Sequence, residues 1–166
     1  MKNEQSLFVP GSKNGKTVAI VGGGPAGLSA ARELALLGYS VTIFEAEKKA
    51  GGLNTYGIVS FRLPPSISYW EVQQIESLDV EILTNTRVGK DISVEKVLND
   101  YDATLIAIGM SKVPNLGIEG EDLVGVYDAI EFVKDTKVNK ITDEFIEPII
   151  IGKNNKPPKT YLLNIQ

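Results

Sequence analysis

The stretch Val18-Ala-Ile-Val-Gly-Gly-Gly-Pro-Ala-Gly-Leu-Ser-Ala-Ala31 decides the fold class of this chain. It opens on a short β-branched run that predicts a buried strand over residues 17–21. Three glycines end that strand, and Pro25 has the fixed φ that suits the first position of a helix. Apolar residues then recur at helical spacing up to Gly38, and a second strand is predicted over Ser40–Phe44. This order predicts a right-handed parallel β–α–β unit.

The glycines at Gly22, Gly24 and Gly27 form the pattern G-x-G-x-x-G between the predicted strand and the predicted helix. The first glycine permits a tight turn, the second lets a pyrophosphate approach the backbone, and the third lets helix and strand pack closely. Pro25 and Ala26 open the helix, whose free N–H groups and dipole favour a phosphate. An ordinary strand–turn–helix is the alternative interpretation.

Glu45 follows the second predicted strand at the spacing typical of this motif. A carboxylate there can accept hydrogen bonds from an adenosine ribose, and it repels a 2′-phosphate, so this site is not expected to prefer NADP. The alternative is an exposed glutamate without a role.

Composition excludes several classes of chemistry. The 166 residues are 43% hydrophobic, which is enough for the core of about one domain, and they include neither cysteine nor histidine. Disulfides, thiolate catalysis, iron–sulfur ligation by cysteine, histidine-ligated metals and Ser-His-Asp catalysis are therefore excluded within this chain. Any redox chemistry requires a cofactor, and we predict no catalytic side chain and no metal site.

Charge and hydropathy predict neither a nucleic-acid partner nor a membrane partner. The net charge is −4, without a basic face. The first residues carry an acid and no apolar segment, and the longest apolar-looking stretch contains charged side chains. We expect a cytoplasmic protein.

Further elements follow along the chain, and together they predict the α/β class with a parallel sheet. The expected elements are helices over 67–78, 93–99 (capped by Ser93) and 127–134, and strands over 80–83, 103–108 and from 149 onward.

The segment after Glu45 resembles a known family. Residues 18–31, Glu45 and Gly51-Gly52-Leu53 resemble the FAD-binding signature of flavoproteins with two dinucleotide-binding domains. The longer stretch Gly51-Gly-Leu-Asn-Thr-Tyr-Gly-Ile-Val-Ser-Phe-Arg-Leu-Pro64 resembles the small subunit of glutamate synthase and the flavin-containing half of NAD(P)-dependent dihydropyrimidine dehydrogenase. The resemblance implies FAD as cofactor, NAD(P)H as electron donor in the full-length family, and an iron–sulfur or catalytic partner subunit. A plain turn at Gly51-Gly52 is the alternative.

The resemblance also implies individual contacts to the cofactor. Gly52 and Leu53 would lie close to FAD, and Arg62 would reach its phosphate or flavin region with a guanidinium suited to that task. The backbone of Val88 would meet the adenine. Ala107 and Gly109 belong to a second glycine motif, in which Ile108 replaces the usual threonine. The alternatives are a solvated arginine, a core valine and a structural strand end.

The resemblance covers roughly residues 15–152, and it predicts the domain organisation. Residues 1–16 are a lead-in, 17–148 a Rossmann-like FAD-binding domain, and 149–166 the start of an NAD(P)-binding domain with a divergent tail. Pro157 and Pro158 prevent the helix that the family would place there. We hypothesise a truncated or frame-disrupted member, a natural tail being the alternative. The fold would be incomplete, so we expect marginal stability, self-association through an uncovered sheet edge, or reliance on a partner chain.

Three functions follow as hypotheses. The first is an FAD-dependent NAD(P)H oxidoreductase module that passes electrons to an iron–sulfur partner. The second is a non-enzymatic truncated or split fragment that binds nucleotide weakly and needs a partner chain. The third, a single-domain NAD-dependent dehydrogenase, is disfavoured by Gly51-Gly52, by Arg62 and by the lack of a hydride-transfer acid.

Overall fold

The computed structural model describes residues 7–110, 114–124 and 126–138. The chain divides into two compact units, Met1–Ser111 and Lys112–Gln166. A four-stranded sheet with the order β3-β2-β1-β4 forms the first unit. The strands are β1 (Thr17–Val21), β2 (Ser40–Phe44), β3 (Glu81–Leu83) and β4 (Ala103–Ile106).

All three strand pairs of the sheet are parallel. Val21 at the end of β1 is in register with Phe44 of β2 and with Ile106 of β4, so three carboxyl ends meet at one edge. The order 3-2-1-4 matches the first four strands of the doubly wound dinucleotide-binding order 3-2-1-4-5-6. The chain leaves β1 in one direction to β2 and reaches β4 on its other side, which creates a crevice at the carboxyl end of β1. The predicted α/β class with a parallel sheet is confirmed.

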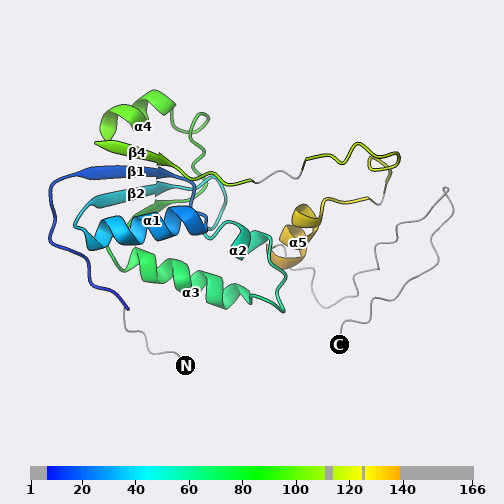
Figure 1. Ribbon diagram of the computed structural model, residues 1–166, viewed down its shortest axis with the longest axis horizontal. Coiled ribbons are helices and arrows are strands. Elements are labelled where there is room, and N and C mark those ends of the chain that lie inside the picture. The colour runs from blue at the N-terminus through cyan, green and yellow to red at the C-terminus, as the bar shows by residue number, and fades with distance from the viewer. Residues whose placement is uncertain (1–6, 111–113, 125, 139–166) are drawn as a thin grey trace. The chain divides into compact units, whose positions relative to one another are not determined.

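Helices cover both faces of this sheet. Figure 1 shows α1 and α3 together on one face and α4 on the opposite face. The helices of the first unit are α1 (Pro25–Leu36), α2 (Leu53–Tyr56), α3 (Pro65–Glu76) and α4 (Val94–Asp100). Because both faces are covered, consecutive residues of the central strands are buried, from Val18 to Ile20 in β1 and from Val41 to Phe44 in β2.

The core has two layers that follow the alternation of side chains along β1. Val18 and Ile20 pack on the face of α1 and α3, in a cluster that also contains Ile43 and Leu78. Ala19 faces the other way. It belongs to a second cluster with Phe44 and Val97 of α4, partly covered by Tyr101, whose ring meets the Phe44 ring edge-on at 5.9 Å.

The lead-in segment is docked on the first unit. The N–H of Gly11 donates to the carbonyl of Ala35 at 3.0 Å, and the guanidinium of Arg32 lies 5.2 Å from the centre of the Phe8 ring. The end of α1 is thus covered by residues that precede β1.

The predicted strands at 17–21 and 40–44 agree with the structure residue for residue. Several other boundaries were wrong by a few residues. Helix α3 begins at Pro65 because proline is favoured at the first helical position, and it ends at Glu76. Strand β3 begins at Glu81, and β4 ends at Ile106 rather than at residue 108. Helix α2 was missed, because four residues are too short to show a period.

Two caps define the remaining helices. The hydroxyl of Ser93 accepts a hydrogen bond from the N–H of Lys96 at 3.1 Å, so the predicted cap of α4 is confirmed. In the second unit, the helix predicted over 127–134 is α5 (Ala129–Val138). It starts two residues later because the Asp128 carboxylate accepts from the N–H groups of Ile130 and Glu131. The strand predicted from Ile149 lies outside the described residues.

None of the helices in the described part of the chain has the length and apolar character needed to cross a membrane.

Candidate functional site

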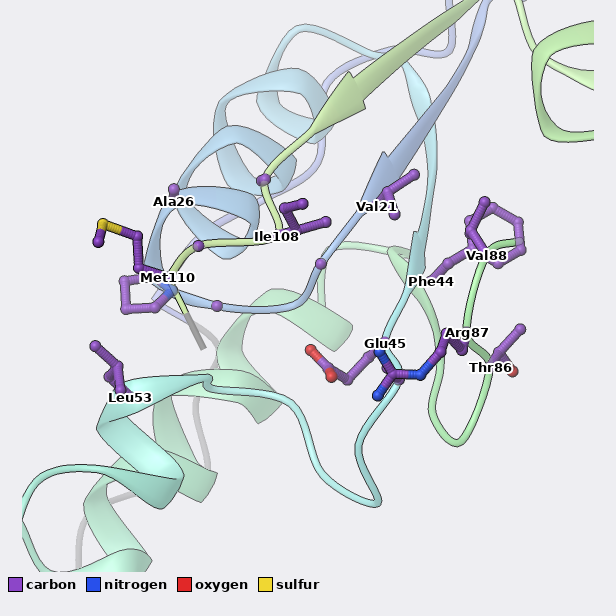
Figure 2. Close-up of a pocket in the computed structure, with 16 residues that line it drawn as sticks. Val21, Ala26, Phe44, Glu45, Leu53, Thr86, Arg87, Val88, Ile108 and Met110 are labelled. Atoms are coloured by element: carbon purple, nitrogen blue, oxygen red, sulfur yellow. The ribbon is translucent and has the colours of Figure 1, made fainter. Parts of the chain in front are cut away.

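A pocket of about 460 Å³ opens at the carboxyl ends of β1, β2 and β4 (Figure 2). Its volume lies within the range of small-molecule sites, about 300–1,000 Å³. The lining residues come from the glycine loop, from the ends of β2 and β4 and from the loop after β3. They are Val21, Gly22, Gly24, Pro25, Ala26, Phe44, Glu45, Ala46, Leu53, Thr86, Arg87, Val88, Ala107, Ile108, Gly109 and Met110.

The glycine loop needs two of its glycines for close packing. Gly22 has φ +112°, and a Cβ there would lie 2.4 Å from the carbonyl oxygen of Ala107. A Cβ on Gly27 would lie 2.0 Å from the carbonyl oxygen of Gly22. Gly27 does not line the pocket; it lets the first turn of α1 pack directly against the loop, which is the role the motif predicts for a third glycine.

Helix α1 begins at the pocket without a cap from any side chain. Its N-cap, Gly24, makes no side-chain hydrogen bond, and the first turn contains no acidic residue. Pro25 and Ala26, the first two helical residues, line the pocket. The N–H groups of such a turn have no intrahelical acceptor, and the helix dipole adds positive potential there. This end of α1 can therefore receive an anion.

Glu45 places a fixed carboxylate in the same pocket. Its side chain is only 7% exposed. The N–H of Gly23 donates to Oε2 at 2.8 Å, and the N–H of Glu47 donates to Oε1 at 2.7 Å. An ionised carboxylate has about four acceptor positions, so it retains capacity for two further donors such as hydroxyl groups. The alternative of an exposed glutamate is wrong.

The Gly51-Gly52 pair lies against the glycine loop. The N–H of Gly51 donates to the carbonyl of Gly23 at 2.7 Å. Gly52 has φ +52°, and a Cβ there would lie 2.8 Å from the Cα of Gly24. Gly52 therefore borders the pocket wall without lining it, whereas Leu53 lines it. The plain turn left open as the alternative is in fact a close backbone contact between two loops.

A buried tyrosine holds the segment before this glycine pair. The hydroxyl of Tyr56 accepts a hydrogen bond from the N–H of Lys49 at 2.9 Å. Burial raises the pKa of Tyr56 to about 12, so the phenol is protonated at neutral pH. Tyr56 thus acts as a neutral anchor for the loop behind the pocket.

The loop after β3 supplies the wall beside Glu45. The N–H of Thr86 donates to the carbonyl of Glu45 at 2.8 Å, and the N–H of Arg87 donates to the Asp91 carboxylate at 2.8 Å. Val88 lines the pocket and also packs on the cluster around Phe44. Figure 2 shows Thr86, Arg87 and Val88 on the same side of the view as Glu45, with Leu53 and Met110 on the other side.

Sequence reasoning missed several wall residues. Thr86 and Arg87 directly precede the predicted Val88, so their position after a parallel strand was the available signal. Ile108 was noted only as a departure from the family motif. Val21, Phe44, Ala46 and Met110 gave no chemical signal, because apolar side chains look like ordinary core residues.

The end of β4 forms the opposite wall. The N–H of Ala107 donates to the carbonyl of Val21 at 2.8 Å, which is the last bond of the β1–β4 ladder. Gly109 has φ +64° and no neighbouring atom within 4 Å of a Cβ placed there. Both residues line the pocket, as Gly22 and Gly24 do.

Three of the predicted site residues do not line this pocket: Gly27 and Gly52 support its loops from behind, and Arg62 lies elsewhere. It lies in an exposed turn, in which its N–H donates to the carbonyl of Val59 at 3.0 Å. No group of three or more histidine, cysteine, aspartate or glutamate side chains that could hold a metal occurs in the described residues.

The fold and the site together define an α/β domain of the dinucleotide-binding kind. The chain belongs to the pyridine nucleotide-disulphide oxidoreductase family, whose model matches residues 16–152. Since the chain contains no cysteine, it carries no redox disulphide of its own.

Curated relatives support the resemblance drawn from the sequence. The chain is 46% identical over 129 residues to the NADP(+)-dependent formate dehydrogenase subunit beta of Moorella thermoacetica, covering 76% of this chain and 18% of that protein. It is 39% identical over 125 residues to the NADPH glutamate synthase small chain of Bacillus subtilis, covering 75% of this chain and 25% of that protein. It is 36% identical over 163 residues to the NADPH-Fe(3+) oxidoreductase subunit beta of Geobacter sulfurreducens, covering 93% of this chain and 24% of that protein. The expected relation to the glutamate synthase small chain is confirmed, and the chain spans a quarter or less of these three relatives.

Solved structures agree with this placement. FprA of Mycobacterium tuberculosis in complex with NADPH superposes with a TM-score of 0.63 at 29% identity, covering 72% of this chain and 28% of that one. A 2-naphthoyl-CoA reductase superposes with a TM-score of 0.60 at 28% identity, covering 76% and 19%.

Proposed function

We propose that this chain binds FAD in the pocket at the ends of β1, β2 and β4 and forms the flavin part of an NAD(P)H oxidoreductase. The single observation that carries the proposal is that one pocket joins an uncapped helix start to a buried carboxylate. The N–H groups at the start of α1 suit a diphosphate, and Glu45 suits a ribose diol. In a dinucleotide, the diphosphate is attached to the same ribose that carries the diol, so the two groups lie close together.

The residues of this chain have binding and orienting roles in the proposal. Gly22, Gly24 and Gly27 give the diphosphate access to the backbone, and Pro25 and Ala26 begin the helix that receives it. Glu45 accepts from the ribose hydroxyls, and Val88 offers its backbone to the adenine. Gly52, Leu53, Ala107 and Gly109 border the flavin-side continuation of the pocket.

We propose that Arg62 contacts the phosphate or flavin end of FAD from outside the pocket walls. Bound FAD would supply the chemistry of accepting a hydride. The pocket walls contain no histidine or cysteine, and we propose no catalytic acid or base from this chain.

The electron path of the proposal starts at NAD(P)H and ends at an iron–sulfur or catalytic partner subunit in the cytoplasm. Its support is the wording of the relatives' names: two specify NADPH, one specifies NADP(+), and two are subunits beta of oxidoreductases. Since this chain spans a quarter or less of those relatives, the electron donor and the acceptor are part of the proposal.

A second candidate function is a nucleotide-binding chain that is inactive alone and needs a partner chain. The observation that favours it is the exposed wall of the pocket at β4, where Ile108 and Met110 are 66% and 79% exposed. Apolar side chains of this kind, beside a sheet edge, indicate a surface that another segment or chain covers.

The visible absorption spectrum of the purified chain tests the proposal. The spectrum is recorded before and after FAD is added and the excess is removed. A retained and shifted flavin spectrum is the expected result, and NADH and NADPH are then added to look for bleaching. A retained flavin without bleaching favours the second candidate. A colourless protein that also fails to bind ADP in a calorimetric titration contradicts both.

A further inference from the structure

Two buried hydroxyl groups lie behind the Gly51-Gly52 loop. The side chains of Thr55 in α2 and Ser68 in α3 are each 1% exposed, and their oxygens are 2.7 Å apart. Thr55 Oγ1 donates to the carbonyl of Ala50 at 2.8 Å. Because a threonine hydroxyl has one proton, Ser68 is the donor in the bond between the two hydroxyls. The hydrogen bonds therefore all donate in one direction, from Ser68 in α3 through Thr55 to the carbonyl of Ala50 in the loop.

This chain of bonds continues into the pocket. After Ala50, the N–H of Gly51 donates to the carbonyl of Gly23 at 2.7 Å, and the N–H of Gly23 donates to Oε2 of Glu45 at 2.8 Å. The contacts are tight. A Cβ on Gly51 would lie 1.9 Å from Thr55 Oγ1, and one on Gly52 would lie 2.8 Å from the Cα of Gly24. A shift of residues 50–52 therefore acts directly on residues 22–24, because the backbones of the two loops are in contact.

Stability alone does not explain these hydroxyls. A buried hydrogen-bonded pair contributes little net free energy compared with apolar side chains of the same shape. The hydroxyls add a directional constraint. An apolar contact at this position would tolerate a displacement of the loop, whereas the hydrogen bond to Ala50 fixes the position of its carbonyl. Neither hydroxyl lines the pocket, so any effect on a ligand acts through the two loops.

We propose that Thr55 and Ser68 are positioning residues that set the spacing between loop 50–52 and the glycine loop, and so the affinity of the site for the diphosphate of an adenine nucleotide. The inference rests on the proposed function and deepens it. The adenosine end should depend on the hydroxyl pair less than the diphosphate end does, because Glu45 is held independently by the N–H of Glu47 at 2.7 Å.

The test compares T55V, T55S and S68A in the full chain. T55V keeps the shape and removes the hydroxyl, while T55S keeps the hydroxyl. The matched control is T42V, because Thr42 is also a buried threonine (8% exposed) whose hydroxyl bonds to Glu81 at 3.0 Å, away from the two loops. Two readouts are used: amide hydrogen exchange of Gly23 and Gly51 without ligand, and calorimetric titration with ADP and with AMP.

T55V and S68A are expected to speed exchange at Gly23 and Gly51 about tenfold beyond any change at Ile20 and Ile43, in line with the loss of one buried hydrogen bond. Binding of ADP should weaken about tenfold and binding of AMP less, and T55S should behave as the parent chain. T42V should leave the ratio of ADP to AMP affinity unchanged.

Two failures are distinguishable. If T55V and S68A change exchange at Gly23 and Gly51 no more than at Ile20, or weaken ADP and AMP equally, the positioning role is overturned while the proposed function stands. If the parent chain binds neither nucleotide, the proposed function fails, and the exchange rates still decide whether the hydroxyls couple the two loops.

Discussion

The carboxylate of Glu45 and the backbone N–H of Gly23 are joined by a hydrogen bond of 2.8 Å between Oε2 and N. This bond ties the end of β2 to the turn that follows β1, two points separated by the whole of α1. A ligand that reaches the start of α1 therefore meets a carboxylate whose position is already fixed. The geometry favours a site that is formed before a ligand arrives.

Replacement of Glu45 by glutamine tests this carboxylate. Glutamine has one oxygen, so it can accept from the buried N–H of Gly23 or from the half-buried N–H of Glu47, and the other N–H loses its acceptor. Leaving a buried donor unsatisfied costs about 1–3 kcal/mol. We expect E45Q to lower the melting temperature and to weaken ADP binding about tenfold or more, measured by thermal denaturation and calorimetric titration.

Glu81→Gln is the matched control, because Glu81 is an exposed carboxylate on the adjacent strand that accepts from the Thr42 hydroxyl at 3.0 Å. E81Q should leave ADP binding unchanged. Equal ADP affinity in E45Q and the parent chain would contradict the assigned role of Glu45.

Gly52→Ala tests the contact between the two glycine loops. A Cβ at this position meets the Cα of Gly24 at 2.8 Å, and φ is +52°. Gly15 has φ +78° with no atom within 4 Å of its Cβ position, so G15A carries the cost of the left-handed backbone alone. We expect G15A to lose about 1 kcal/mol of stability with unchanged ADP binding. G52A should lose more stability and at least about tenfold in ADP affinity. Similar ADP affinities for the two variants would show that the loops move apart freely.

Asp102 predicts a pH dependence at the other end of the sheet. Its carboxylate accepts from the N–H of Thr17 at 2.8 Å and from Lys16 Nζ at 3.0 Å. These bonds, the Thr17 amide first, lower the pKa of Asp102. The stabilisation is therefore complete above the ordinary carboxyl pKa of 3.8 and is lost as the pH falls through the lower pKa of the folded state.

D102N should lower the melting temperature by a few degrees at pH 7, and the difference from the parent chain should shrink below pH 3.8. Melting curves across this pH range measure the difference. D100N is the control, since Asp100 forms an exposed ion pair with Lys96 that contributes little. A difference that stays constant down to the lowest pH would mean that charge on Asp102 has no part in stability.

Strand β4 predicts self-association. Within residues 7–110 no strand pairs with its outer edge, and Ile106 is 72% exposed there. An unpaired apolar edge favours pairing with another chain. We expect sedimentation velocity to detect concentration-dependent dimers or larger species, and I106K to reduce them.

V94K adds the same charge on α4 and should leave the association as it is. A monodisperse monomer with a cooperative melt at high temperature would contradict the role assigned to this edge.

Much of the fold could be predicted from the sequence because local signals agreed. The β-branched run at 17–21, the glycines and Pro25 each specify backbone geometry by their own chemistry, and the structure has β1 and β2 at the predicted residues. The start of β3 and the end of β4 have no adjacent glycine or proline at the observed boundary, and there the predicted boundaries differ from the structure by one or two residues. Pairing with a neighbouring strand decides where such a strand begins or ends.

For the site, the sequence by itself determined the residues with unusual chemistry: the glycines, the helix start and the acid after β2. Their spacing along the chain is sufficient because a β–α–β unit has one handedness and brings these positions to one edge. Only the tertiary structure decided which walls close the pocket, because Arg87, Ile108 and Met110 reach it through strand order rather than through sequence distance. It also placed Arg62 outside the pocket, and it brought Thr55 and Ser68 together across two helices, a contact for which no local pattern exists.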